Sequence, residues 1–204
     1  MSTSRGGLPF FDLVFAQRAC REYADEPVDD ETVELIMRAG THAPSAENKQ
    51  PWEFIVVRDP HAQKVIHDCV EEAWSNAREL ERPRLTPELF KEVDYGQGGG
   101  GYRTAPVLVV VCADMERGLA STAPASIFPC VQNMLLAAGA LGYASALTTI
   151  GTHAKDELRE LLALPESVTP MAILPIGRPA RMPGPPRRAP VAQHAHRDRY
   201  GQPW

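Results

Sequence analysis

The sequence lacks the cysteine patterns that identify several classes of small protein. Its four cysteines, Cys20, Cys69, Cys112 and Cys130, are widely spaced and include no Cys-x-x-Cys pair. This spacing gives no support to a zinc ribbon, a thioredoxin-like site or a dense disulfide framework. Because free cysteine is often buried, Cys20 and Cys130 are expected to be small core residues.

Long hydrophobic runs and a broad basic excess are also missing. No stretch approaches the roughly 18 apolar residues of a membrane-spanning helix, and the apolar run near the N-terminus is interrupted at Asp12. We therefore expect a cytoplasmic protein with no membrane partner. A formal net charge of −5 argues against a nucleic-acid partner, which would require an excess of lysine and arginine.

Common catalytic motifs are absent as well. The sequence contains neither G-x-S-x-G nor H-E-x-x-H. The pair His194 and His196 falls short of the three or four ligands of a usual metal site, so no metal is expected. The glycines at 98–101 precede a predicted strand instead of following one, unlike a dinucleotide-binding fingerprint. They are interpreted as a mobile surface or lid loop.

What is present is a chain of 204 residues with 44% hydrophobic residues, enough for one large domain spanning 1–204. Asp29 and Thr152 are expected to cap helices, and Trp52 is expected to be packed. Apolar spacing places Val65, Cys69, Ala73 and Ala77 on one stripe of a helix. Helices are expected at 10–20, 31–40, 61–80, 86–94, 125–141 and 153–164, and strands at 52–58, 106–113, 145–150 and 171–177.

The last segment, 178–204, has a composition of its own. It holds six arginines, one aspartate and few hydrophobic residues. Such a segment cannot form a core of its own, so we expect it to lie as an arm on another surface.

Three stretches carry chemical information. Arg18 and Arg21 stand three apart, and they either pair with nearby carboxylates or form a fork suited to phosphate oxygens. The loop 43–52 contains Ser45, Asn48 and Gln50, which either shape a turn or bind a heteroaromatic edge. The third stretch is the pair Arg187 and Arg188 in the arm.

Together these stretches resemble the FMN-dependent nitroreductase family. The matching motifs are R-A-x-R-x-Y at 18–23, A-P-S-x-x-N-x-Q-P-W at 43–52, G-x-x-S-x-L-T-T at 142–149 and an arginine in the tail. The resemblance extends from about residue 10 to 200. It implies an α+β fold with a mixed central sheet surrounded by helices. It also implies a homodimer with FMN at the subunit interface and a C-terminal arm that crosses to the partner subunit.

The resemblance also implies a set of cofactor-binding residues. The family pattern R-R-S-x-R is altered here by Gln17 and Ala19, which shifts the phosphate contacts to the two arginines and to backbone N–H groups of Ala19 and Cys20. The implied contacts are Arg18, Ala19, Cys20 and Arg21 to the phosphate and ribityl chain, Pro44, Ser45, Ala46 and Asn48 to the partner's flavin, Thr148, Thr149 and Ile150 near the flavin N5–O4 edge, and Arg188 with Arg187 to the phosphate.

The implied activity is an NAD(P)H oxidoreductase with a ping-pong mechanism. NADH or NADPH delivers hydride to the flavin and leaves, and a nitroaromatic, quinone or related small-molecule acceptor then takes its place. No catalytic side chain is assigned. One alternative is a protein that binds or sequesters flavin without turnover.

Another alternative is a flavin-fragmenting or reductive-dehalogenating relative. Such enzymes carry a lid built for their substrate, which would lie at 78–104. The residues Arg84, Tyr95, Tyr102 and Arg103 in this region either contact an aromatic or anionic ligand or belong to a solvated loop.

Overall fold

The computed structural model of the chain describes residues 9–98 and 100–204. Helices and strands alternate irregularly along the chain, so the α+β class is confirmed. The elements are α1 (Phe10–Ala16), α2 (Asp30–Thr41), β1 (Trp52–Val57), α3 (Pro60–Glu81), α4 (Pro87–Gln97), β2 (Val107–Asp114), α5 (Ala123–Ala140), β3 (Ala144–Ser145), α6 (Lys155–Leu161) and β4 (Val168–Gly177).

The central sheet has the strand order β1-β2-β4-β3. Every pair of neighbouring strands among the described residues is antiparallel, which corrects the expected mixed sheet. The apolar run 106–113, which forms most of β2, suggested a strand covered on both faces, a feature typical of parallel sheets. An antiparallel sheet between two helical layers buries such a strand equally well.

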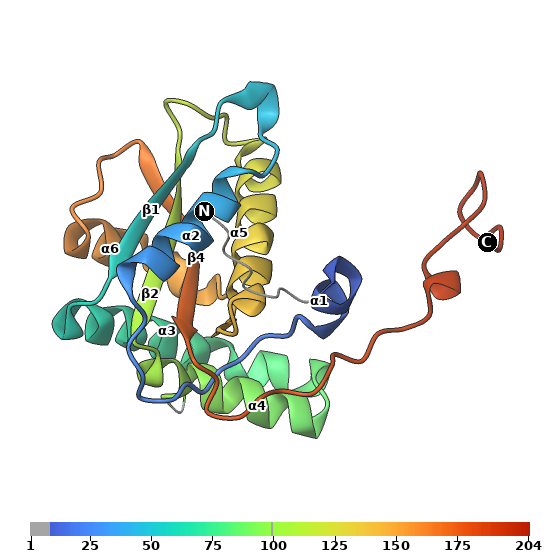
Figure 1. Cartoon of the computed structure of the whole chain (residues 1–204), viewed down its shortest axis with the longest axis horizontal. Helices are drawn as coiled ribbons and strands as arrows, with labels where there is room; N and C mark the ends of the chain where they lie inside the picture. The colour runs from blue at the N-terminus through green and yellow to red at the C-terminus, as the bar shows by residue number, and fades with distance from the viewer. Residues whose placement is uncertain (1–8, 99) are drawn as a thin grey trace.

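The residues of β2 alternate between two cores, one on each face of the sheet. Figure 1 shows the helices that surround this sheet. Val107, Val109 and Val111 pack with residues of α2 and α5. Leu108 and Val110 pack on the opposite face with residues of α3 and α6. This alternation is the two-residue period of a strand, and it fixes which face each helix covers. The helix α4 lies outside these layers and packs against α3.

Helix capping was predicted correctly at one position and wrongly at another. The Asp29 carboxylate accepts a hydrogen bond of 2.6 Å from the Thr32 backbone N–H, which confirms its role as the cap of α2. Thr152 does not cap α6, because that helix begins later and follows Ala154. The Thr152 hydroxyl instead donates to the carbonyl oxygen of Thr149 over 2.7 Å, within a short 3₁₀ turn.

Two elements are shorter than predicted. The helix α1 ends at Ala16 rather than at residue 20, because the following residues extend toward the sheet and Cys20 N–H donates to Ser145 O over 3.0 Å. The strand expected at 145–150 is reduced to β3 and a single bridge between Thr148 and Ile173.

The buried face of α3 is rotated from the predicted one. The predicted stripe, Val65, Cys69, Ala73 and Ala77, is only half-buried. The fully buried residues are instead Ile66, His67, Val70 and Trp74. Spacing alone placed the stripe one position away: Ile66 and Val70 pack into the core against the sheet, and α4 covers Trp74. The expected burial of Cys20, Cys130 and Trp52 is confirmed.

The arm begins on its own chain and then leaves it. Pro179 bridges to Tyr23, and Ala180 N–H donates to Glu22 O over 3.2 Å. Farther on, the arm extends away from the layered body (Figure 1) and exposes Tyr200 and Trp204. Within the described residues, no helix is both long and apolar enough to span a membrane.

Candidate active site

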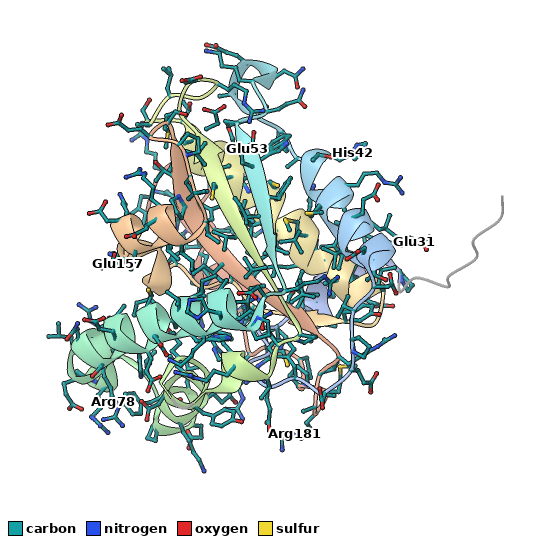
Figure 2. All side chains as sticks on the ribbon, turned by 90° about the vertical axis from the view of Figure 1, so that its left-hand side faces the viewer. Glu31, His42, Glu53, Arg78, Glu157 and Arg181 are labelled. Carbon is teal, nitrogen blue, oxygen red and sulfur yellow. The ribbon has the colours of Figure 1, made fainter. Side chains whose placement is uncertain are left out.

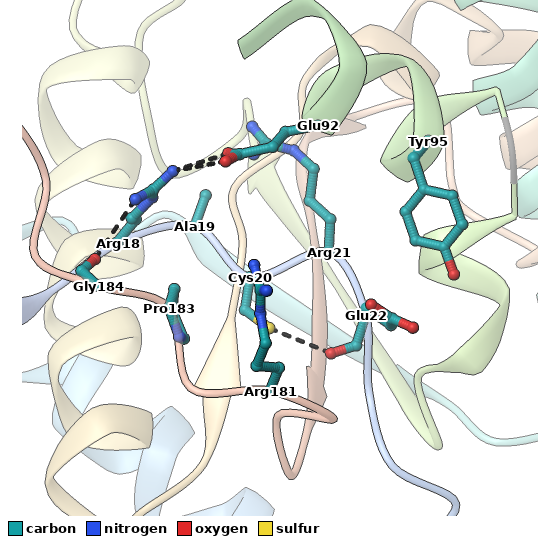
Figure 3. Close-up of a pocket in the computed structure, with 10 residues that line it drawn as sticks. All are labelled: Arg18, Ala19, Cys20, Arg21, Glu22, Glu92, Tyr95, Arg181, Pro183 and Gly184. Atoms are coloured by element: carbon teal, nitrogen blue, oxygen red, sulfur yellow. Dashed lines mark hydrogen bonds and ion pairs between the residues drawn. The ribbon is translucent and has the colours of Figure 1, made fainter. Parts of the chain in front are cut away.

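A basic pocket lies where the segment after α1, the helix α4 and the start of the arm meet (Figure 3). Its volume is about 150 Å³, below the roughly 300–1,000 Å³ of common small-molecule sites. One chain therefore forms only part of an enclosure for a ligand as large as a flavin. The lining residues are Arg18, Ala19, Cys20, Arg21, Glu22, Glu92, Tyr95, Arg181, Pro183 and Gly184.

Arg18 is held by a carboxylate that is distant in the sequence. Its Nη2 donates to both oxygens of Glu92, on α4, over 2.8 and 2.9 Å. Its Nη1 donates to Gly184 O over 3.4 Å at the start of the arm. Both contacts appear in Figure 3 as dashed lines. Arg18 therefore pairs with a carboxylate, but the partner is Glu92 on α4 and not a carboxylate nearby in the sequence, such as Glu22 or Asp25. Phosphate binding by Arg18 stays a prediction.

Arg21 lies in a groove made by two glycines. A Cβ on Gly96 would stand 2.3 Å from Arg21 Cδ, and a Cβ on Gly101 would stand 2.1 Å from Arg21 O. Any larger residue at either position would displace the arginine or its backbone. The Nε of Arg21 is buried without a hydrogen-bond partner in the structure, so it retains the capacity to donate.

The segment that carries these arginines is fixed by its own chain. Tyr23 is buried, and its hydroxyl donates to Cys20 O over 2.6 Å. The Tyr23 N–H donates to Thr104 Oγ1 over 2.8 Å. Burial raises the pKa of the Cys20 thiol, so this cysteine stays neutral and gives no sign of a nucleophile. The Cys20 N–H is already bonded to Ser145 O, which removes it from the expected phosphate donors.

The described glycines of the run, Gly98, Gly100 and Gly101, are buried or half-buried and do not form the expected surface loop. Gly99 lies outside the described residues. A Cβ on Gly98 would stand 2.8 Å from Trp74 Cδ1. Gly101 is buried beneath Arg21. The described part of the run therefore serves close packing between α3, α4 and the arginine segment.

The other charged and aromatic residues of the expected lid differ in their burial and in their partners. Tyr102 is buried, and burial raises its pKa. Arg103 pairs with Asp68 and Glu71, and Arg84 pairs with Glu81. Among these candidates Tyr95 lines the basic pocket.

Residues 148–150 lie on the same side of the sheet as the arginine segment. Cys20 links to β3 through Ser145 O, and Thr148 pairs with Ile173 three residues farther on. Thr148 is buried, Thr149 is exposed and Ile150 packs against the core. This group is therefore brought near residues 18–21, although it does not line the pocket.

Residues 44–48 lie at the opposite end of the molecule. They lead into β1, whose Glu53 is labelled at the end of the sheet opposite Arg181 in Figure 2. The loop is tightly built, since Ser45 Oγ accepts from Gln50 N–H over 3.0 Å and Asn48 has a φ of 55°. Pro44 and Asn48 are exposed, and Ser45 and Ala46 are half-buried. A single chain does not bring this loop to the basic pocket.

The two arginines of the arm are exposed and lie beyond the pocket. Arg188 Nη1 donates to the carbonyl oxygen of its neighbour Arg187 over 2.9 Å. The arm arginine that lines the pocket is Arg181 instead.

Sequence reasoning missed Glu92 and Arg181 as pocket residues. Glu92 is one of two glutamates on this helix, and nothing in its local sequence distinguishes it. Arg181 belongs to a segment whose basic composition was noted, so its charge was the available signal.

The pocket suits a phosphate group. Three guanidinium groups, those of Arg18, Arg21 and Arg181, line it together. A guanidinium matches phosphate oxygens with paired hydrogen bonds, and the buried Arg21 Nε has no acceptor among residues 9–98 and 100–204. In contrast, the described residues contain no group of three or more potential metal ligands.

Comparisons with known proteins agree with this geometry. Residues 14–178 match the Nitroreductase family. A relative from Archaeoglobus fulgidus, named "Putative NADH dehydrogenase/NAD(P)H nitroreductase", is 31% identical over 176 residues, which are 82% of this chain and 83% of the relative. The rat protein "Iodotyrosine deiodinase 1" is 27% identical over 180 residues, 84% of this chain and 62% of the relative.

A solved structure extends the likeness to three dimensions. It is described as a "putative nitroreductase in complex with fmn" from Desulfovibrio desulfuricans. The TM-score is 0.75 at 28% identity, covering 95% of this chain and 98% of that one.

Proposed function

Because the chain belongs to the nitroreductase family, we propose that it is an FMN-dependent oxidoreductase that uses NADH or NADPH to reduce nitroaromatics, quinones or related acceptors. The observation that carries the proposal is the pocket shared by Arg18, Arg21 and Arg181. The similarity to a solved structure whose description includes FMN supports it.

In this proposal the basic pocket holds the phosphate end of FMN. Arg18 and Arg21 bind phosphate oxygens, and Arg181 adds a third positive charge from the arm. Arg21 contributes most to a fixed geometry, because Gly96 and Gly101 hold its stem and backbone in place. Of the two expected backbone donors, the N–H groups of Ala19 and Cys20, that of Ala19 remains for the phosphate, because Cys20 N–H donates to Ser145 O.

When bound, FMN supplies the hydride-transfer chemistry, and the protein supplies position and electrostatics. Residues 148–150 lie toward the flavin ring in this arrangement, with Thr148 fixed by its pairing to Ile173. No side chain of the chain is assigned a catalytic role.

The complete site requires two copies of the chain. The loop with Pro44, Ser45, Ala46 and Asn48 is too far from the pocket of its own chain to contribute, and the arm with Arg187 and Arg188 extends outward. A homodimer in which the 44–48 loop of each copy contacts the flavin of the other accounts for the position of the loop and for that of the arm. The exposed aromatic residues Phe10, Phe11 and Phe15 of α1 offer apolar surface for that interface.

The visible spectrum of the purified protein tests this function. We expect a yellow protein, or a colourless one that becomes yellow with FMN, whose absorbance NADH or NADPH bleaches and a quinone restores. A protein that takes up no FMN contradicts the proposal. If neither NADH nor NADPH reduces the bound flavin, the oxidoreductase proposal is contradicted and the flavin-sequestering alternative remains.

Reductive dehalogenation is the second candidate, supported by the 27% identity to iodotyrosine deiodinase over 84% of the chain. Iodide release from iodotyrosine by the reduced protein tests it. If no iodide appears while quinone is reduced, the first candidate stands.

A further inference from the structure

Glu92 forms an ion pair with Arg18, the arginine that the proposed function assigns to the phosphate of FMN. Both of its carboxylate oxygens accept from Arg18 Nη2, over 2.9 and 2.8 Å. A phosphate group that binds Arg18 in the pocket must therefore replace this carboxylate or share the arginine with it.

Resting on the proposed function, we infer that Glu92 determines how strongly the site prefers FMN over riboflavin. FMN carries a phosphate that competes with Glu92 for Arg18. Riboflavin has no phosphate, so it leaves the pair between Arg18 and Glu92 intact. Glu92 thus lowers the affinity for FMN and leaves the affinity for riboflavin unchanged.

The exchange is energetically accessible because the ion pair is partly exposed. The side chain of Arg18 is 31% exposed and that of Glu92 is 46% exposed. Pairs of this kind are weak, since water already solvates both partners. A phosphate monoester carries a charge of about −1.5 to −2 at pH 7, more than one carboxylate, so it replaces Glu92 at Arg18. The loss of the Arg18–Glu92 pair lowers the net affinity for FMN.

Removing the Glu92 charge leaves α4 in place, because other contacts anchor this helix. Asp94 accepts from Arg78 Nε over 2.6 Å and from Trp74 Nε1 over 2.8 Å. Gly96 packs directly on the stem of Arg21. The Arg78 guanidinium lowers the pKa of Asp94 to about 2, so this anchor is charged at neutral pH.

The test compares Glu92→Gln with Glu88→Gln in the full-length protein. Glu88 is an exposed glutamate on the same helix outside the pocket, so its substitution makes the same change in net charge. Dissociation constants for FMN and for riboflavin are measured by calorimetry. We expect Glu92→Gln to tighten FMN binding by roughly 3- to 10-fold, the scale of a partly exposed ion pair together with the loss of a neighbouring like charge.

Riboflavin binding should be unchanged in both variants, and Glu88→Gln should bind FMN as the parent protein does. Unchanged or weaker FMN binding by Glu92→Gln overturns the inference while leaving the proposed function intact. Equal tightening of riboflavin also overturns it. If the parent and both variants bind no FMN, the proposed function fails and this inference fails with it.

A double-mutant cycle identifies Arg18 as the shared partner. In an Arg18→Gln background, Glu92→Gln should tighten FMN binding clearly less than in the parent protein, because only the loss of the like charge remains. Tightening of the same size in both backgrounds shows that Glu92 does not act through Arg18, which also overturns the inference.

Discussion

The arginine segment 18–23 and the distal arm 185–204 carry the same kind of charge in opposite surroundings. Arg21 is enclosed by Gly96 and Gly101, and Tyr23 ties the segment to its own chain. Arg187 and Arg188 are exposed. The difference teaches that tertiary packing within one chain fixes the arginine segment, whereas the distal arm is not held by the layered body of its own chain; in the proposed function the arm is held by a second copy.

The largest effect should come from deleting residues 185–204. The deletion removes the exposed arm and spares Arg181 and the contacts of residues 179–180 with the body. We expect loss of the dimer, and a loss of FMN binding of at least about 3 kcal/mol if both arm arginines bind the phosphate. Analytical ultracentrifugation and FMN titration measure the two effects. A truncated protein that stays dimeric and yellow would refute the role of the arm.

Substitution of Arg21 should give the next largest effect. Arg21→Ala removes a charged donor whose position is set by two glycines, so we expect FMN binding to weaken by about 1.5–3 kcal/mol. The same change at Arg18 should cost less, because the gain from the Arg18–phosphate contact is partly offset in the parent protein by the loss of the Arg18–Glu92 ion pair. Fluorescence titration with FMN measures both. If Arg18→Ala has the greater effect, the comparison between the two arginines is wrong.

A glycine substitution sharpens the contrast between the enclosed segment and the arm. In Gly101→Ala the new Cβ would meet Arg21 O at 2.1 Å, whereas a Cβ on Gly184 would meet nothing within 4 Å. We expect Gly101→Ala to lower the free energy of unfolding by about 1–3 kcal/mol, the usual cost of overpacking. Gly184→Ala is the matched control and should be neutral. Equal stability of the two variants in urea denaturation would contradict the close packing at Gly101.

The sequence predicted the elements whose signal is local. The cap at Asp29 and the apolar β2 were readable because each depends on neighbouring residues. The arginine pair was also identified, since its motif is contiguous. Glu92 and Arg181 were not, because tertiary packing alone brings α4 and the arm to the pocket.

The same limit explains the error in α3. Helical spacing defined an apolar stripe, but α4 determined which side of the helix became buried at Trp74. Likewise, a glycine run reads as a loop in the sequence. The stem and backbone of Arg21 that fill the space beside Gly96 and Gly101 are visible only in three dimensions.

A smaller effect concerns pH and contrasts a buried histidine with an exposed one. Burial, with the nearby Arg103 charge, lowers the pKa of His67 to about 4. The unfolded chain therefore takes up a proton near pH 6.5 that the folded chain refuses until about pH 4, so stability falls as the pH drops through this window. At pH 5 the loss relative to pH 7 should be about 2 kcal/mol.

His67→Leu should remove this part of the pH dependence, because leucine cannot take up the proton and the His67 Nε2 has no hydrogen-bond partner to lose. His194→Leu, in the exposed arm, should leave the profile unchanged. Urea denaturation at pH 5 and pH 7 measures the difference. A parent protein and a His67→Leu variant with identical profiles would contradict the prediction.

The account rests on the claim that the pocket of Arg18, Arg21 and Arg181 binds the phosphate of FMN. Calorimetric titration of the full-length protein with FMN and with riboflavin tests it most directly, since the two ligands differ only in the phosphate. The account predicts that FMN binds at least about tenfold more tightly, the contribution of one charge-assisted hydrogen bond. Equal affinity for the two flavins would contradict it.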